Sequence, residues 1–103
     1  MPRYRVTFTE KAKAQLRSAL AWWRKHRPEA PELLAAEMRA VVAALREAPE
    51  IGFAYRGPRG TALRKVPLHR SRRMVFYVLD RETRTVTIVA LWGAVRGKPP
   101  PLT

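Results

Sequence analysis

The sequence predicts an α+β fold in which an antiparallel-rich sheet is covered on one face by a helical hairpin. Three observations lead to this prediction: strand-forming segments gather in the second half of the chain, two stretches with helical periodicity precede them, and one short strand precedes the helices. The order β-α-α-β-β-β, with the helices grouped together, is typical of this class. At 103 residues the chain is long enough for one domain with a single core.

The strongest strand signals lie in residues 63–66, 74–79 and 85–92. The last two segments are rich in β-branched and aromatic residues, and residues 80–84 between them form a polar connection short enough for a hairpin. Both segments are apolar at nearly every position, which indicates central strands covered on both faces. One cover is expected to be the helices. The other face is expected to be an exposed apolar patch, rimmed by arginines, that binds a partner.

The first half of the chain is predicted to form one strand and two helices. Alternation in residues 4–8 indicates a strand with one polar face. Thr9 is a suitable N-cap for a helix that ends near His26, and prolines then separate it from a second helix that ends near Glu47. Residues 49–60, which are rich in glycine and proline, are expected to form a loop. The expected buried face of the second helix comprises Glu32, Leu34, Met38, Val41, Val42 and Leu45.

The chain carries 21 lysine and arginine residues against 8 aspartate and glutamate residues, a formal net charge of +13. Residues 51–79 contain no acidic side chain. Such a field attracts RNA, DNA or an acidic protein segment, although a generally basic surface is the alternative interpretation. The cations of this stretch are Arg56, Arg59, Arg64, Lys65, Arg70, Arg72 and Arg73.

Several classes of site are not expected. The chain has no cysteine, which excludes disulfides and thiolate metal sites, and we expect no metal or other cofactor. No apolar run approaches the roughly 20 residues of a membrane span. We therefore expect a cytoplasmic protein without a membrane partner.

Residues 1–95 are expected to form the domain, and residues 96–103, with three consecutive prolines, a basic tail.

Four segments, in this order and at this chain length, resemble the RelE/ParE superfamily of toxins from type II toxin–antitoxin systems. They are PEIG at residues 49–52, LRKV at 63–66, RRMVFYVLD at 72–80 and IVALW at 88–92. The resemblance implies a small growth inhibitor that is neutralised by a cognate acidic antitoxin. The superfamily contains ribosome-dependent mRNA endoribonucleases and inhibitors of DNA gyrase, so the resemblance leaves both targets open.

RNA cleavage through the 2′-hydroxyl requires a proton acceptor, a proton donor and fixed positive charge. In RelE-like enzymes, strand-borne basic residues and a C-terminal tyrosine do this work. By resemblance, Arg64 and Arg73 match two basic positions, but Val66 falls where a second basic residue is expected. No tyrosine or histidine follows Trp92, although Arg96 is a further basic candidate. The chain therefore favours a ParE-like toxin that docks on DNA gyrase without bond-making chemistry of its own.

A RelE-like mRNA endoribonuclease remains the alternative. Its catalytic residues would be Arg64, Arg73, His69 and Arg96. His69 suits acid–base work at neutral pH, but a lone histidine without a placed partner is better explained as an exposed turn residue. A third possibility is an attenuated member that mainly binds its antitoxin within a DNA-bound repressor complex.

Other side chains are assigned to target binding or to the core. Tyr77 is expected in the core or an interface, and Trp22 lies off the helix stripe, where it is free for a partner. One or two of the basic residues are explained as the solvated edge of a hairpin, but seven cations without a compensating acid favour target binding. The candidate target-binding residues are Arg59, Arg64, Lys65, Arg70, Arg72, Arg73 and Lys98.

Overall fold

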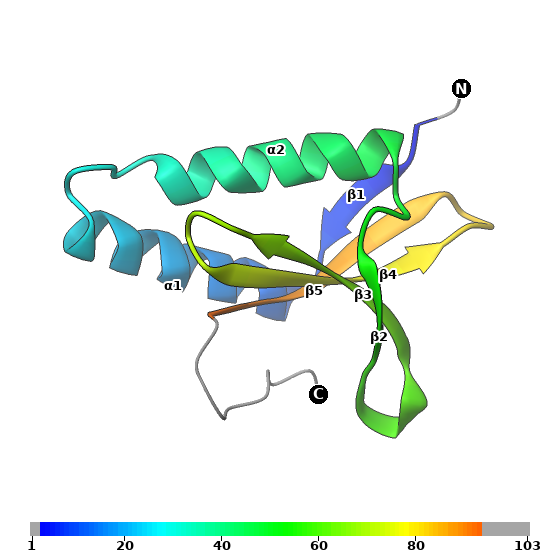
Figure 1. Cartoon of the computed structure of the whole chain (residues 1–103). Coiled ribbons are helices and arrows are strands. Elements are labelled where there is room, and N and C mark those ends of the chain that lie inside the picture. Colours follow the sequence, from blue (N-terminus) through cyan, green and yellow to red (C-terminus); the bar gives the residue numbers. More distant parts are fainter. Residues whose placement is uncertain (1–2, 94–103) are drawn as a thin grey trace.

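The computed structural model describes residues 3–93 and confirms the α+β fold. Two helices follow the first strand and precede the rest of a five-stranded sheet, in the order shown in Figure 1. The predicted tail at residues 96–103 lies outside the described residues. The elements are β1 (Arg5–Phe8), α1 (Glu10–His26), α2 (Leu33–Glu47), β2 (Phe53–Arg56), the 3-10 turn η1 (Pro58–Gly60), β3 (Ala62–Leu68), β4 (Arg73–Asp80) and β5 (Thr85–Gly93).

The strand order in the sheet is β1-β5-β4-β3-β2. β1 pairs with β5 in parallel, and the other three pairings are antiparallel. β4 therefore lies at the centre, as its continuous apolar sequence predicts. The predicted β4–β5 hairpin is also confirmed, because the two strands pair in antiparallel fashion up to Asp80 and Thr85. In its turn, the Asp80 carboxylate accepts hydrogen bonds from the backbone N–H groups of Glu82 and Thr83 at 3.0 and 3.2 Å.

Both helices lie on one side of the sheet, where they form the core with it (Figure 1). Leu34 and Leu45 of α2 and Val75, Tyr77 and Ile88 of the sheet are all fully buried. Burying one such side chain contributes about 1.5–3 kcal/mol relative to leaving it exposed. Neither helix, among the described residues, is long and apolar enough to cross a membrane.

The prediction of an uninterrupted loop at residues 49–60 is wrong, because residues 53–56 form the edge strand β2. Phe53 and Tyr55 lie opposite Lys65 and Leu63 on β3. The strand is only four residues long, and a glycine stands immediately before and after it. Those glycines indicate a loop in the sequence, whereas pairing with β3 determines the backbone conformation.

The face of the sheet opposite the helices is less open than predicted. Side chains alternate along a strand, so Phe76 and Ala90, which pair with each other, point away from the helices. Phe76 is nevertheless only 4% exposed and Ala90 fully buried. The ring of Tyr55 covers part of this face, with its centroid 5.1 Å from that of Phe76. The prediction of an open apolar patch is therefore wrong for the middle of the sheet. Phe53, on the edge strand β2, is strongly exposed.

Helix α1 begins and ends where the sequence predicts. The Thr9 hydroxyl accepts a hydrogen bond from the Ala12 N–H at 3.1 Å, as an N-cap does. At the other end, the His26 ring bonds the Trp22 carbonyl through Nδ1 at 2.9 Å. Because a carbonyl oxygen can only accept, Nδ1 carries the proton in this contact.

Replacing Thr9 with alanine is expected to lower the free energy of unfolding by about 1 kcal/mol, because the Ala12 N–H loses its partner. Thr9→Ser retains the hydroxyl and should keep most of the stability. Urea unfolding followed by circular dichroism measures both variants. Equal stability of the alanine and serine variants would contradict a capping role.

Helix α2 differs from the prediction at its first turn. Glu32 does not belong to the buried face: it is the exposed N-cap residue and forms an ion pair with Arg24 at 3.7 Å. Glu37, on the following turn, is half-buried and accepts hydrogen bonds from the backbone N–H groups of Arg70 and Ser71 at 3.0 and 2.9 Å. The turn between β3 and β4 is thereby held against α2.

Candidate functional site

The predicted target-binding cations do not form one cluster. Arg59 lies in η1, at one end of β3, whereas His69, Arg70 and Arg72 follow its other end. Because β3 has seven residues, these two groups are roughly 20 Å apart. Figure 1 shows the η1 turn extending away from the helices and the β3–β4 turn lying beside them. The basic stretch of the sequence is therefore divided between two ends of the molecule.

Arg64 and Lys65 point to opposite faces of β3, as neighbours in a strand do. The Arg64 guanidinium donates hydrogen bonds to the carbonyls of Glu50 and Gly52 at 3.2 and 2.9 Å. The Lys65 ammonium lies 5.1 Å from the ring centroid of Tyr55 on the other face. Arg64 therefore anchors the backbone before β2, and the two side chains cannot contact the same small ligand.

Tyr77 is a core residue, as predicted. Its hydroxyl donates a hydrogen bond to the Pro49 carbonyl at 2.6 Å and accepts one from the Gly52 N–H at 2.9 Å. Burial raises the pKa of Tyr77 above its usual value. Gly52 must lack a side chain, because a Cβ atom there would lie 2.7 Å from the Tyr77 hydroxyl oxygen. Tyr77 is therefore unsuited to donate a proton to a substrate.

His69 is exposed in the turn between β3 and β4. Within residues 3–93, its side chain forms no hydrogen bond or ion pair. The turn around it is well defined, because the Arg72 N–H donates to the Leu68 carbonyl at 2.8 Å. A general base is normally oriented by a third group, and the described part of the chain supplies none for this imidazole.

Arg73 packs against the end of α1. Its guanidinium carbon lies 5.5 Å from the ring centroid of Trp22 and 5.7 Å from that of Trp23. Arg27 contacts the same two rings at 5.6 and 5.8 Å. Burial lowers the pKa of Arg73, and the charge of Arg27 adds to this effect. We call Trp22, Trp23, Arg27 and Arg73 the indole–arginine cluster.

Sequence reasoning missed this cluster, apart from the exposure of Trp22 and the candidacy of Arg73. Trp22 is 43% exposed, as predicted for a residue off the helix stripe, whereas Trp23 is buried and donates from Nε1 to the Ala30 carbonyl at 2.8 Å. Arg27 and Arg73 are separated by 46 positions, and the sequence contains no signal that brings them together. The two arginines meet only in the fold, where the first residue of β4, Arg73, lies beside the tryptophans near the end of α1.

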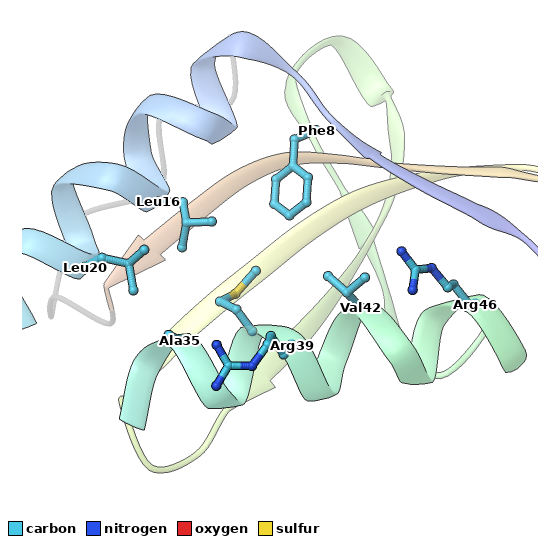
Figure 2. Close-up of a pocket in the computed structure, with 8 residues that line it drawn as sticks. Phe8, Leu16, Leu20, Ala35, Arg39, Val42 and Arg46 are labelled. Atoms are coloured by element: carbon cyan, nitrogen blue, oxygen red, sulfur yellow. The ribbon is translucent and has the colours of Figure 1, made fainter. Parts of the chain in front are cut away.

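An apolar groove of about 480 Å³ lies between α1, α2 and β1. Figure 2 shows Leu16 and Leu20 of α1, Phe8 of β1 and Val42 of α2 facing the space between the two helices. These side chains are only partly buried, because both helices pack mainly on the sheet. We call this site the helix-hairpin groove. Its lining residues are Phe8, Leu16, Leu20, Ala35, Met38, Arg39, Val42 and Arg46.

Arg39 and Arg46 give the helix-hairpin groove a positive rim. Both are exposed, and neither guanidinium forms an ion pair within residues 3–93. An apolar floor with a cationic rim suits an amphipathic segment whose polar side is acidic. The sequence pattern assigned several of these apolar residues to the core. Helical periodicity identifies the apolar face of each helix, but it does not show that the two helices leave a space between them.

Two predicted site residues, Arg96 and Lys98, lie outside the described residues. Within residues 3–93, no group of three His, Asp or Glu side chains is arranged to hold a metal ion. The structure thus separates the remaining candidates into the η1 turn, the β3 faces and the region where the β3–β4 turn meets α1.

Residues 6–96 match the family model described as the ParE toxin of the type II toxin–antitoxin system parDE. No curated protein sequence matches the chain significantly. Three solved structures share this fold, and their toxins differ: one is described as ParDE and two as RelE or RelBE.

The chain is similar to the chromosomal ParDE toxin–antitoxin system of P. aeruginosa, with 17% identity and a TM-score of 0.69 over 89% of this chain and 97% of that one. It is also similar to the RelBE2 toxin–antitoxin complex of M. tuberculosis, with 25% identity and a TM-score of 0.62 over 88% and 91%. For the isolated RelE toxin of E. coli the identity is 26% and the TM-score 0.55 over 92% and 88%.

Proposed function

Because the chain belongs to the family of ParE toxins of type II toxin–antitoxin systems, we propose that it inhibits growth by binding DNA gyrase. In this proposal the protein performs no bond-making chemistry and is neutralised by a cognate antitoxin. The observation that carries the proposal is the arrangement of the groups that RNA cleavage would need.

Those groups are separated or already engaged. Arg64 pairs with Tyr77 and Arg73 with Leu68, so the two arginines lie four residue steps apart along β3 and β4, or roughly 13 Å. The Arg64 guanidinium binds two backbone carbonyls, and the Tyr77 hydroxyl is buried. His69 has no orienting partner in the described part of the chain. General acid–base catalysis requires groups within hydrogen-bond reach of the same reacting atoms, so this arrangement favours binding over cleavage.

The purified toxin is expected to inhibit supercoiling of relaxed plasmid DNA by gyrase and to leave cell-free translation unaffected at the same concentration. Both reactions are run on one preparation, with toxin preincubated with its antitoxin as the control that restores supercoiling. Cleavage of mRNA on translating ribosomes, with supercoiling intact, would contradict the proposal.

A ribosome-dependent mRNA endoribonuclease is the second candidate. It is supported by the likeness to solved RelE toxins at 26% identity and by the position of Arg73, which is only half-buried beside the β3–β4 turn. The same two assays separate the candidates. If translation fails and mRNA is cut, loss of cutting in a folded Arg73→Ala variant would identify the endoribonuclease.

We further propose that the antitoxin occupies the helix-hairpin groove with an amphipathic acidic segment. The similar solved structures include toxin–antitoxin complexes of M. tuberculosis and E. coli. In this chain the groove offers an apolar floor for the apolar side of a helix, and Arg39 and Arg46 for its acidic side. Burying the partly exposed leucines and valine of the groove provides the hydrophobic contribution to binding, and charge complementarity provides orientation.

A further inference from the structure

The indole–arginine cluster brings two positive charges to one place, and no carboxylate of residues 3–93 forms an ion pair with either of them. Each guanidinium carbon lies within 6 Å of both indole ring centroids at the end of α1, and the charge of Arg27 contributes to the lowered pKa of Arg73. Their remaining hydrogen bonds go to backbone carbonyls, from Arg27 to His26 and from Arg73 to Ser71. Neither forms an ion pair within residues 3–93.

Two of the carboxylates around this end of the molecule are engaged elsewhere. Glu32 pairs with Arg24, and Glu37 accepts the backbone N–H groups of Arg70 and Ser71. The turn that leads into β4 adds the cations Arg70 and Arg72, both exposed. An anion that binds between two neighbouring guanidiniums reduces their mutual repulsion and accepts charge-assisted hydrogen bonds from both. The cluster therefore suits an anionic ligand.

The exposed rings of Trp22 and His26 indicate which kind of anionic ligand the cluster would bind. Trp22 is 43% exposed although its ring stacks on His26, with centroids 4.4 Å apart and planes 16° apart. His26 is itself exposed. Stacked rings beside cations bind bases together with phosphates, as in proteins that recognise single strands. The carboxylates of an acidic peptide would pair with the arginines but would not stack on the Trp22 and His26 rings.

We propose that Trp22, His26, Arg27 and Arg73 form a binding site for single-stranded nucleic acid. Phosphates bind between the two arginines, and a neighbouring base packs against the exposed Trp22–His26 stack. No bond is cleaved at this site. The proposal goes beyond gyrase binding and does not depend on it, because it concerns direct binding of an oligonucleotide by the toxin alone.

The experiment titrates the full chain into fluorescein-labelled oligothymidylate and oligouridylate of about 12 nucleotides, within the range of known single-strand sites. A DNA duplex of the same length and a polyglutamate peptide are the comparison ligands. Fluorescence anisotropy measures binding, and quenching of tryptophan emission reports contact with the rings. Equal binding of the two oligonucleotides indicates recognition of base and phosphate alone, and stronger binding of oligouridylate indicates that the 2′-hydroxyl contributes.

Three variants separate stacking from general electrostatics. Trp22→Ala should weaken single-strand binding roughly tenfold, because it removes the stacking surface. Arg27→Ala should weaken binding and reduce the slope of log K against log salt concentration by about 1, as expected for one lost phosphate contact. Arg17→Ala is the matched control, because Arg17 is exposed on the same helix, outside the cluster. It should bind nearly as the unmodified protein does.

Folding is checked by circular dichroism, and Trp22→Phe serves as a second variant. This change keeps an aromatic ring and should retain most of the affinity while losing most of the quenching. The proposal is overturned if the unmodified protein binds duplex as tightly as single strands, or if Arg17→Ala weakens binding as much as Arg27→Ala does. Binding of polyglutamate without binding of oligonucleotides would also overturn it and would assign the cluster to an acidic protein. None of these results bears on gyrase inhibition, which is measured separately.

Discussion

Replacing Tyr77 with phenylalanine is expected to lower the free energy of unfolding by about 2–4 kcal/mol, although only one oxygen atom is removed. The Tyr77 hydroxyl donates to the Pro49 carbonyl and accepts from the Gly52 N–H, and both of those residues are buried. Without it, two backbone groups lose their partners inside the protein. Urea unfolding of both proteins, monitored by circular dichroism, measures the difference.

Tyr55→Phe provides the matched control. Tyr55 is half-buried in the same sheet, and its hydroxyl forms no hydrogen bond within residues 3–93, so its loss should change stability by less than about 0.5 kcal/mol. A similar cost for both variants would mean that the Tyr77 hydrogen bonds are not what fixes the segment before β2.

Replacing Arg39 and Arg46 together with glutamate is expected to weaken antitoxin binding by about 100-fold, because like charges would then meet across the helix-hairpin groove. Both side chains are exposed, so the change should leave the core intact. Titration calorimetry with the cognate antitoxin measures the affinity. In cells, the double variant should remain toxic when the antitoxin is co-expressed.

The control for this experiment is the pair Arg17→Glu and Lys25→Glu on α1. It makes the same change in net charge and, like Arg46→Glu, removes a cation from the last turn of a helix. Neither residue lines the helix-hairpin groove. If both double variants lose affinity equally, the antitoxin responds to the overall charge of the toxin, and the groove is not its docking site.

The fold could be predicted from the sequence where local patterns and tertiary packing agree. The continuous apolar sequence of β4 identified the central strand, and Thr9 marked the start of α1. β2 could not be predicted, because its flanking glycines indicate a loop and only pairing with β3 makes residues 53–56 a strand. The exposure of the far face was also mispredicted, because Tyr55 of that unexpected strand covers Phe76.

The candidate sites were harder to predict than the fold. Arg64 and Arg73 stand in the expected strands, but the sequence does not show that one guanidinium binds backbone carbonyls and the other packs on two indoles. Those contacts depend on residues 12 to 51 positions away. The helix-hairpin groove is likewise a property of the separation between two helices, which periodicity does not encode.

The parallel pairing of β1 with β5 affects when this toxin can form during synthesis. β1 comes first in the chain, yet the strand with which it pairs among residues 3–93 is β5, residues 85–93. A nascent chain that ends before residue 85 also leaves one side of β4 unpaired, because β5 is missing and only β3 is present. The ribosome must therefore release nearly the whole polypeptide before the sheet can close, and prematurely terminated products should not reach the folded, growth-inhibiting form.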